Sequence, residues 1–438
     1  MLNHELIVYR AFEPEEGQIL EDIAFLMERG EAMAQEGGEA RGKARDLLHR
    51  SVNSLLELAG TNGFYGNLWH CYLANLLVNH ENSYSRACEI RGAVEGTVNE
   101  AALHDIAIFK QLYDYDFGPL TAALDMPFFG MVLSYEPCPE AGRIYNTRIR
   151  DRICALARQM SGARTAQEMK DELTGFYREY GVGKFGLHKA FRVARDEHGV
   201  HIVPILNIRH VHMDDLVGYE LAKEKLIENT EAFVAGKPAN NCLLYGDAGT
   251  GKSSSIKAIT NEYYDRGLRI IEVYKHQFQD LNEVIAQIKS RNYRFIIYMD
   301  DLSFEDFEIE YKYLKAVIEG GLEKKPENVL IYATSNRRHL IRESFHDRDG
   351  TDFSEKHGGD TVQEKLSLAS RFGVSIYFGA PSMEEYQQIV EKLAQRNGIE
   401  TAGEELRQEA VRWEMRHGGF SGRTAQQFID HLLGKEQQ

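Results

Sequence analysis

The fold of this chain is decided by the stretch Cys242-Leu243-Leu244-Tyr245-Gly246-Asp247-Ala248-Gly249-Thr250-Gly251-Lys252-Ser253. From Gly246 onward it matches the pattern GxxxxGK[ST]. An apolar run typical of a strand precedes the pattern, and apolar residues at helical spacing follow it through Ile256 and Ile259. Strand, glycine loop and helix in this order are the context that a phosphate-binding loop requires, so we predict one here.

Each residue type in this loop suits one part of a nucleoside triphosphate. Glycines let the backbone curl so that successive N–H groups point at phosphates, and the N-terminus of the following helix adds positive potential. Lys252 brings a charge to the β- and γ-phosphates, and the hydroxyl of Ser253 is a ligand for Mg²⁺. We therefore expect ATP and Mg²⁺ as cofactors. The predicted contacts in the loop are Gly246, Asp247, Ala248, Gly249, Thr250, Gly251, Lys252, Ser253 and Ser254.

Two further apolar runs end in polar side chains: the first ends in Asp300 and Asp301, and the second ends in Asn336. In phosphoryl-transfer sites one acid holds the magnesium ion and another group positions the attacking water. We predict Asp300 as a metal ligand, Asp301 as the catalytic acid that positions or deprotonates water, and Asn336 as a group that orients this water. By themselves, paired acids are often part of a solvated loop, and Asn336 would be an ordinary turn residue.

Two arginines are candidates for stabilising charge on the γ-phosphate in the transition state. Arg371 lies at the end of a helical pattern just before the last predicted strand, and Arg423 opens a helix near the C-terminal end of the chain. Either could instead form a surface ion pair. Arg337 and Arg338 adjoin Asn336 and are weaker alternatives.

Apolar, β-branched runs alternate with helical patterns from residue 214 onward. Runs without polar alternation are typical of strands buried on both faces of a parallel sheet. After Pro381 only helical patterns remain. We predict an α/β fold, in which a five-stranded parallel sheet at residues 214–380 is followed by a helical lid at residues 381–438. The predicted strands are residues 241–245, 268–274, 295–299, 329–333 and 374–378.

The first part of the chain has a helical pattern. Apolar residues recur at three- and four-residue spacing, and residues 68–78 have the composition of a buried helix. We predict a mostly helical accessory domain at residues 1–190 and a linker with short strands at residues 191–213. Four histidines near the linker could suggest a metal cluster, but no Cys or carboxylate completes a ligand set at a familiar spacing, which favours ordinary strand residues. These histidines are His198, His201, His210 and His212.

The composition is that of an ordinary globular protein. The 51 basic and 67 acidic side chains give a formal net charge of -16, which argues against coating nucleic acid or an anionic membrane by bulk charge. The five cysteines contain no CxxC pair, which favours reduced thiols over a disulfide scaffold or a zinc module. Neither a signal sequence nor a membrane span is visible, so we expect a cytoplasmic protein with no membrane partner.

The order of these motifs resembles that of the AAA+ ATPases over residues 214–433, about half of the chain. The resemblance implies a homo-oligomer, either a ring or an open spiral and often of six subunits, in which the arginine finger reaches the nucleotide of a neighbour. It also implies an adenine pocket lined by the segment that contains Val217 and Gly218. By the same resemblance the phosphate loop corresponds to Walker A, Asp300 and Asp301 to Walker B, Asn336 to sensor one, Arg371 to the arginine finger and Arg423 to sensor two.

Four runs are also similar to a bacterial family catalogued as domain of unknown function 815, whose members are described only as predicted ATP-binding proteins. The runs are Asn240-Asn-Cys-Leu-Leu-Tyr-Gly246, Asp300-Asp-Leu-Ser-Phe304, Leu314-Lys-Ala-Val-Ile-Glu-Gly-Gly321 and Tyr332-Ala-Thr-Ser-Asn-Arg-Arg-His-Leu340. This likeness implies the fold and the nucleotide, but no substrate.

The chain departs from the AAA+ pattern at Asp301, where motors of this class usually have Glu. The Asp carboxylate is one methylene shorter and lies farther from the water, so hydrolysis is expected to be slow. Tyr274 is the nearest candidate for a pore-loop aromatic, but an ordinary surface role is favoured. Residues 344–360 have the composition of an insertion, in which a metal site from His346 and His357 is a minor alternative.

Three functions are compatible with these features. The leading one is an Mg-ATP-hydrolysing remodeller whose N-terminal half recruits an unknown protein or DNA client. The second is a nucleotide-gated assembly switch with very slow or no hydrolysis. A small-molecule kinase fits poorly, because the two arginines and the C-terminal helices have no natural role in one.

Overall fold

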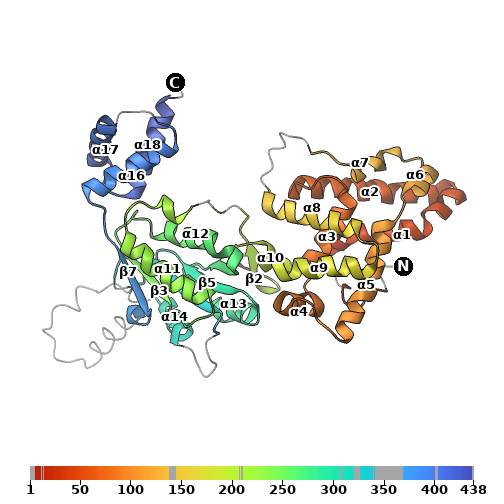
Figure 1. Cartoon of the computed structure of the whole chain (residues 1–438), viewed down its shortest axis with the longest axis horizontal. Coiled ribbons are helices and arrows are strands. Elements are labelled where there is room, and N and C mark those ends of the chain that lie inside the picture. Colours follow the sequence, from red (N-terminus) through yellow and green to blue (C-terminus); the bar gives the residue numbers. More distant parts are fainter. Residues whose placement is uncertain are drawn as a thin grey trace. The chain divides into compact units, whose positions relative to one another are not determined.

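The computed structural model describes residues 5–10, 12, 14–137, 145–206, 208, 211–305, 308–319, 326–338, 340, 368–399 and 403–436. The chain divides into two compact units, Met1–Leu187 and His188–Gln438 (Figure 1). The expected insertion at residues 344–360, with His346 and His357, lies outside the described residues, and so does His210.

The first unit is helical throughout its described part. Its central helix is α3 (Leu68–Asn79), and nine of its twelve residues are buried, which confirms the predicted buried helix. A helix that is apolar on all sides must be surrounded by others. The other helices of this unit are α1 (Pro14–Glu36), α2 (Gly38–Asn62), α4 (Ser83–Arg91), α5 (Thr97–Asp114), α6 (Gly118–Leu124), η2 (Pro127–Phe129), α7 (Gly130–Leu133), α8 (Thr147–Gly162), α9 (Ala166–Tyr180) and α10 (Gly183–Leu187).

The second unit is built on a seven-stranded sheet with the strand order β2-β1-β4-β5-β6-β3-β7. The five strands predicted from the apolar runs are adjacent and parallel in it. The phosphate-loop strand β3 lies between β6 and β7. The bounds of these five strands are β3 (Cys242–Gly246), β4 (Leu268–Glu272), β5 (Arg294–Met299), β6 (Val329–Ser335) and β7 (Val374–Phe378).

The expectation of five strands was incomplete, because the residues assigned to a linker extend the same sheet. Strand β1 (Ala190–Asp196) pairs in parallel with β4, and β2 (Gly199–Pro204) pairs antiparallel with β1. Burial alternates along most of β2 and from Phe191 to Ala194 in β1, unlike in the central strand β6. Such alternation identifies a hairpin but does not show which sheet edge it joins, since that depends on contacts distant in sequence.

Apolar residues cover both faces of the central sheet. Ile270, Ile296 and Leu330 belong to one core cluster together with residues of α11 (Glu220–Val234) and α12 (Lys252–Tyr263). Their immediate neighbours Ile271, Ile297 and Ile331 are equally buried and point to the opposite face. Further helices that the structure describes before β7 are η3 (Met213–Asp215), η4 (Tyr264–Arg266), η5 (Lys275–Asp280), α13 (Leu281–Ile288) and α14 (Glu310–Glu319).

In the described residues after β7, three helices form a second apolar cluster of their own. They are α16 (Met383–Arg396), α17 (Gly403–His417) and α18 (Gly422–Glu436). Ser382 begins α16 with a reciprocal capping box to Glu385. Val217, which precedes the sheet core in sequence, packs against this helical cluster.

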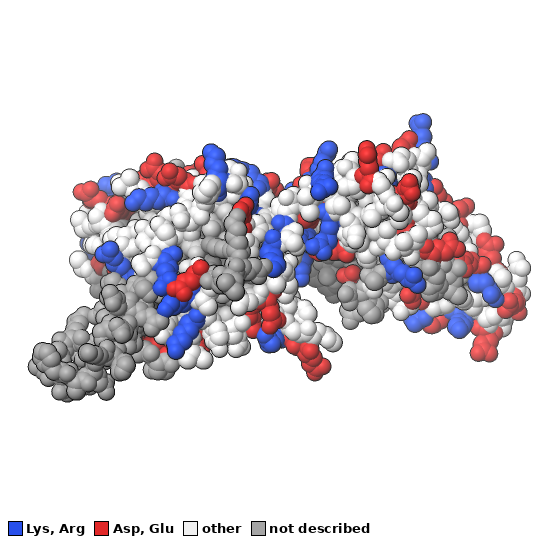
Figure 2. Space-filling model, turned by 90° about the horizontal axis from the view of Figure 1, so that it is seen from below, with Lys and Arg blue, Asp and Glu red and all other residues white. Residues whose placement is uncertain are grey.

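The described surface carries charges of both signs. On the face shown in Figure 2, Lys and Arg side chains are interspersed with Asp and Glu. None of the helices in the described part of the chain has the length and apolar character needed to cross a membrane.

Replacement of Gly246 by alanine should destabilise the second unit. Gly246 has a φ of 137°, and a Cβ there would lie 2.0 Å from the carbonyl oxygen of Phe378 in the adjacent strand. Because that atom is backbone and cannot rotate away, we expect a loss of roughly 2 kcal/mol or more. Thermal melting, together with hydrogen exchange of β3 and β7, measures this.

Gly267→Ala is the matched control for that variant. Gly267 also has a positive φ, 89°, but a Cβ there would meet no atom within 4 Å. It therefore carries the backbone strain alone, about 1 kcal/mol. Equal losses in the two variants would show that the close approach of β3 and β7 is not the cause.

Candidate functional site

The predicted site residues of three strands meet at one edge of the sheet. Strands β3, β5 and β6 are parallel, with β6 between the other two, so their carboxyl ends lie side by side. The phosphate loop follows β3, the Asp300–Asp301 pair follows β5, and Asn336 follows β6. Ligands of open α/β sheets bind outside this edge.

The loop between β3 and α12 has the conformation that its glycines predict. Gly249 and Gly251 adopt φ values of 77° and 94°, in the left-handed region that favours glycine. Helix α12 starts at Lys252, so the N–H groups of its first turn, which includes Ser253 and Ser254, have no acceptor within the helix. They are donors for an anion at this point.

Asp247 fastens the loop to the adjacent strand. Its N–H donates to the carbonyl oxygen of Phe378 at 3.0 Å, and its carboxylate accepts the N–H of Ala380 at 2.8 Å. The Thr250 hydroxyl donates back to the Asp247 carbonyl oxygen at 2.8 Å. Two residues that the pattern leaves variable therefore fix the shape of the loop.

Lys252 lies at the bottom of the site, with 6% of the residue exposed. Its Nζ donates to the carbonyl oxygens of Gly246 at 2.9 Å and Asp247 at 2.6 Å, and to Oδ1 of Asn336 at 3.1 Å. Burial lowers the pKa of the Lys252 ammonium, and nearby carboxylates, among them Asp247, act in the opposite direction. The ammonium is therefore held in place by neutral oxygens, which leaves its charge available to an anion.

The Asp300 carboxylate accepts hydrogen bonds from two hydroxyl groups. Its Oδ1 accepts the Ser253 hydroxyl at 2.8 Å and the Thr334 hydroxyl at 2.5 Å. Although burial acts to raise the pKa of Asp300, these hydrogen bonds lower it below its ordinary value. A carboxylate and a hydroxyl in contact fit a hard cation such as Mg²⁺, which takes one or two protein oxygens and completes its shell with water and phosphate.

Asp301 is linked to the phosphate-loop lysine through Asn336. The Nδ2 of Asn336 donates to Oδ1 of Asp301 at 2.8 Å, while its Oδ1 accepts from Lys252. Asp301 has a φ of 49°, and its N–H donates to the Thr334 hydroxyl at 3.0 Å. A non-glycine residue in this region is uncommon, and Asp is among the residues that tolerate it.

Sequence reasoning assigned no role to two residues of this site. Thr334 is 1% exposed, and its hydroxyl contacts both acids, as described above. Tyr298, two residues before Asp300 and on the same face of β5, is also buried, and burial together with the Asp300 charge raises the pKa of its hydroxyl. The sequence signal that could have identified Thr334 is its position near the end of β6, two residues before Asn336.

Arg423 approaches the phosphate loop from the C-terminal helices. A Cβ on Gly249 would lie 3.2 Å from the Cβ of Arg423 and 3.0 Å from the hydroxyl oxygen of Ser421. The charge of Arg423 is one of the influences that lower the pKa of Lys252. The structure thus brings this arginine to the loop, while its side chain remains exposed.

The segment before α11 lies between the loop and the C-terminal helices. A Cβ on Gly251 would lie 3.4 Å from a methyl carbon of Leu216, and the next residue, Val217, packs on the helical cluster. Gly218 has a φ of 77°. Asp215, the residue before Leu216, forms an ion pair with Arg396 of α16.

Arg371 is not brought to the phosphate loop of its own chain. It precedes β7 and therefore lies at the opposite edge of the sheet from that loop, since β7 is parallel to β3. There it forms an ion pair with Glu319, the last residue of α14. Tyr274 is 48% exposed and donates to Glu272 at 3.1 Å.

Two of the histidines near the predicted linker, His201 and His212, take part in local structure of the chain. His201 lies 2.8 Å from Oδ1 of Asp196 across the β1–β2 hairpin, and His212 begins η3. Among the described residues, no group of three or more His, Cys, Asp or Glu side chains is arranged to hold a metal ion.

Comparisons with known proteins place this arrangement in a family. The family model described as protein of unknown function (DUF815) matches residues 186–436, more than half of the chain. Residues of the chain are 25% identical over 206 residues to the chromosomal replication initiator protein DnaA of Borreliella burgdorferi, covering 45% of this chain and 38% of that one. They are 36% identical over 81 residues to the replication factor C large subunit of Staphylothermus marinus, covering 18% of each chain.

Among solved structures, the chain is similar to the Thermotoga maritima RuvB Holliday junction branch migration motor, with 16% identity, a TM-score of 0.35, and coverage of 50% of this chain and 62% of that one. The chain spans less than half the length of the two curated relatives. The family match covers both the sheet and the C-terminal helices. This chain therefore belongs to the DUF815 family, within the AAA+ P-loop ATPase superfamily.

Proposed function

We propose that the chain binds Mg-ATP at the edge of the sheet and couples its hydrolysis to the remodelling of a protein or DNA client. The observation that carries the proposal is the continuous hydrogen-bond network from Lys252 through Asn336 to Asp301, beside the Ser253–Asp300 pair. A cation that can donate hydrogen bonds to phosphate, a pair of metal ligands and a carboxylate that can receive a proton are thereby held within one site.

Each group has a definite task in this proposal. Lys252 and the N–H groups of the loop bind the β- and γ-phosphates and stabilise charge that shifts among their oxygens. Ser253 and Asp300 would hold a magnesium ion, which would supply further positive charge to the same phosphates. One oxygen of Asp301 accepts from Asn336, and its second oxygen can accept a proton from the attacking water.

Removal of the Thr334 hydroxyl should raise the Mg²⁺ concentration that ATP binding requires. Thr334→Val keeps the side-chain shape but leaves the Asp301 N–H without its acceptor and removes one of the two hydroxyl donors to Asp300. A loss of about 1.4 kcal/mol would raise the Mg²⁺ concentration for half-maximal binding about 10-fold. Thr334→Ser retains the hydroxyl and should behave as wild type; an unchanged magnesium titration in the valine variant would contradict the assignment.

Two arginines extend the proposal to an oligomer. Arg423 lies against the loop of its own chain and can respond to the γ-phosphate there. Arg371 lies at the opposite edge of the sheet, so it can reach a nucleotide only in a neighbouring subunit, after it leaves Glu319. We propose a homo-oligomeric ring or spiral in which the first unit recruits the client; the names of the DnaA and RuvB relatives are compatible with a DNA client.

Phosphate release tests this function. The wild-type chain should release inorganic phosphate from ATP, with turnover per chain that rises with protein concentration as subunits assemble. Arg371→Ala should remove this rise while leaving ATP binding intact. Undetectable release from the wild type at every concentration would exclude the hydrolase.

A nucleotide-gated assembly switch is the second candidate, and Asp301 favours it. The carboxylate is shorter than that of Glu and is already engaged by Asn336, which suits slow hydrolysis. The switch predicts oligomers that form with ATP and dissociate with ADP, with negligible turnover. Light scattering in each nucleotide separates the two functions; assembly that is indifferent to the nucleotide would exclude the switch.

A further inference from the structure

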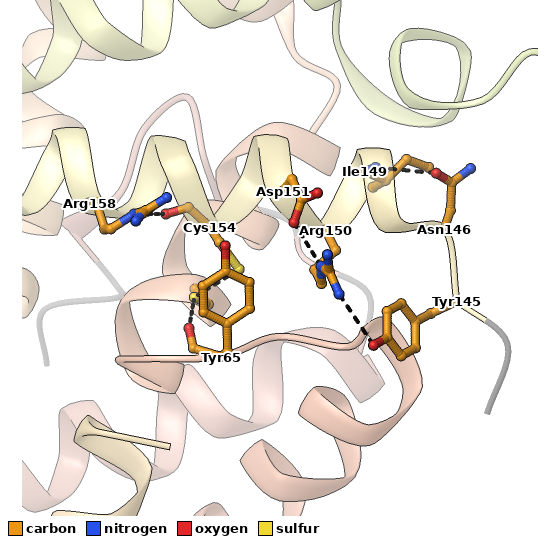
Figure 3. Close-up of polar contacts among 9 residues, drawn as sticks. Tyr65, Tyr145, Asn146, Ile149, Arg150, Asp151, Cys154 and Arg158 are labelled. Carbon is orange, nitrogen blue, oxygen red and sulfur yellow. Dashed lines mark hydrogen bonds and ion pairs between the residues drawn. The ribbon is translucent and has the colours of Figure 1, made fainter. Parts of the chain in front are cut away.

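Two cysteines of the first unit lie in contact although they are 83 residues apart in sequence. The sulfur atoms of Cys71 in α3 and Cys154 in α8 are 3.7 Å apart, and the residues are 3% and 2% exposed. Both helices present their apolar faces to each other, and the cysteines lie within this contact. Figure 3 shows Cys154 on its helix, and the Cys71 thiol lies 3.6 Å from the Tyr65 carbonyl oxygen.

Two arginines flank Cys154 along α8. Arg150 and Arg158 are four residues before and after it, so they lie on the same side of the helix one turn away. Arg158 donates to the Cys154 carbonyl oxygen at 3.3 Å, and Arg150 donates to the Tyr145 hydroxyl at 3.2 Å (Figure 3). A thiol beside cations is more easily ionised than one in purely apolar surroundings.

The contact between the sulfur atoms shifts the pKa values of the two thiols in opposite directions. A hydrogen bond from Cys71 lowers the pKa of Cys154, the charge of Arg150 acts in the same direction, and burial opposes both. The same hydrogen bond raises the pKa of Cys71. Because the two arginines also flank Cys154 on α8, we assign Cys154 as the nucleophile of the pair and Cys71 as the thiol that reacts second.

We propose that Cys71 and Cys154 form an oxidation site, at which a hydroperoxide converts the two thiols into one intramolecular disulfide. In the first step the Cys154 thiolate attacks an oxygen of hydrogen peroxide; the O–O bond breaks, a sulfenic acid forms, and hydroxide takes up a proton and leaves as water. In the second step the Cys71 sulfur attacks the Cys154 sulfur; the S–O bond breaks, the S–S bond forms, and a second water leaves. Two thiols and one peroxide thus give a disulfide and two waters.

The geometry requires only a small movement for this reaction. The sulfurs must approach from 3.7 Å to about 2.05 Å, which rotation of the two side chains and a slight shift of α8 along α3 can supply. The product joins two helices covalently and closes a loop that contains α4 to α7. Oxidation should therefore stiffen the first unit, and this proposal is independent of the nucleotide site.

Peptide mapping of the full chain after oxidation tests the proposal. Reduced protein is treated with one to a few equivalents of hydrogen peroxide, its remaining thiols are blocked, and it is digested without reductant. We expect a peptide pair linked through Cys71 and Cys154, loss of two of the five thiols, and full recovery with dithiothreitol. Oxidation of Cys88 and Cys242 at the same rate, links between chains only, or retention of all five thiols would each overturn it.

Variants separate the roles of the two sulfurs. In Cys71→Ser, dimedone should trap a sulfenic acid at Cys154, since the second step has no partner. Cys88→Ser replaces another buried thiol of the same unit and should leave the linked peptide unchanged. Should a serine variant fail to fold, the wild-type map still decides the matter, because it needs no substitution; equal dimedone labelling of Cys71 in Cys154→Ser would contradict the assignment of the nucleophile.

Discussion

Replacement of Lys252 by alanine should reduce the affinity for Mg-ATP by about 100-fold or more. Hydrogen bonds to charged groups contribute about 1.5–3 kcal/mol each, and 1.4 kcal/mol corresponds to a factor of 10. The ammonium is the one side-chain cation at the bottom of the described site, and the loop carbonyls hold it there. Fluorescence anisotropy with a labelled ATP analogue measures the change, and phosphate release should fall to background.

Lys257→Ala is the matched control for this variant. Lys257 lies on the same helix, α12, but its side chain is exposed. We expect ATP affinity within a factor of about 2 of wild type, since exposed charges contribute little. Because Lys252 also donates to Gly246 and Asp247, circular dichroism should verify that the alanine variant is folded; a folded Lys252→Ala chain with wild-type affinity would show that this loop is not the nucleotide site.

Asp301→Asn should separate ATP binding from hydrolysis. The amide keeps the size of the carboxylate but cannot accept a proton from water, and general-base groups contribute about 10²–10⁴-fold to a rate. We therefore expect turnover to fall by at least about 100-fold, with ATP affinity near that of wild type. The same variant, used as bait, should retain a client in the ATP state.

Asp300→Asn provides the contrast. Asp300 contacts Ser253 and belongs to the metal ligands of the proposed site, so its amide should weaken Mg²⁺-dependent ATP binding itself. If Asp300→Asn and Asp301→Asn show the same defect, either in binding or in turnover, the separate roles proposed for the two acids are wrong.

The core of the fold could be predicted from sequence because its signals are local. The runs of β3 to β6 are apolar on both faces, and the glycine pattern after β3 identifies the turn into α12. The hairpin β1–β2 could not be placed, because its alternating pattern gives two strands but not the edge of β4 that they join.

The site could be predicted only in part for a related reason. Asp300, Asp301 and Asn336 end their strands, and parallel order brings strand ends together. The role of Thr334 depends on an exchange of hydrogen bonds between β5 and β6 that spacing alone does not reveal. In the same way, Cys71 and Cys154 form no sequence motif, and only the packing of α3 on α8 brings their sulfurs together.

Calorimetric titration of the wild-type chain with ATP, with and without Mg²⁺, shows whether the chain binds Mg-ATP as proposed. We expect saturable binding of one ATP per chain, which weakens when Mg²⁺ is withheld because Ser253 and Asp300 then have no ion to share with the phosphates. The absence of saturable ATP binding at millimolar nucleotide with Mg²⁺ present, in a chain shown to be folded, would contradict it.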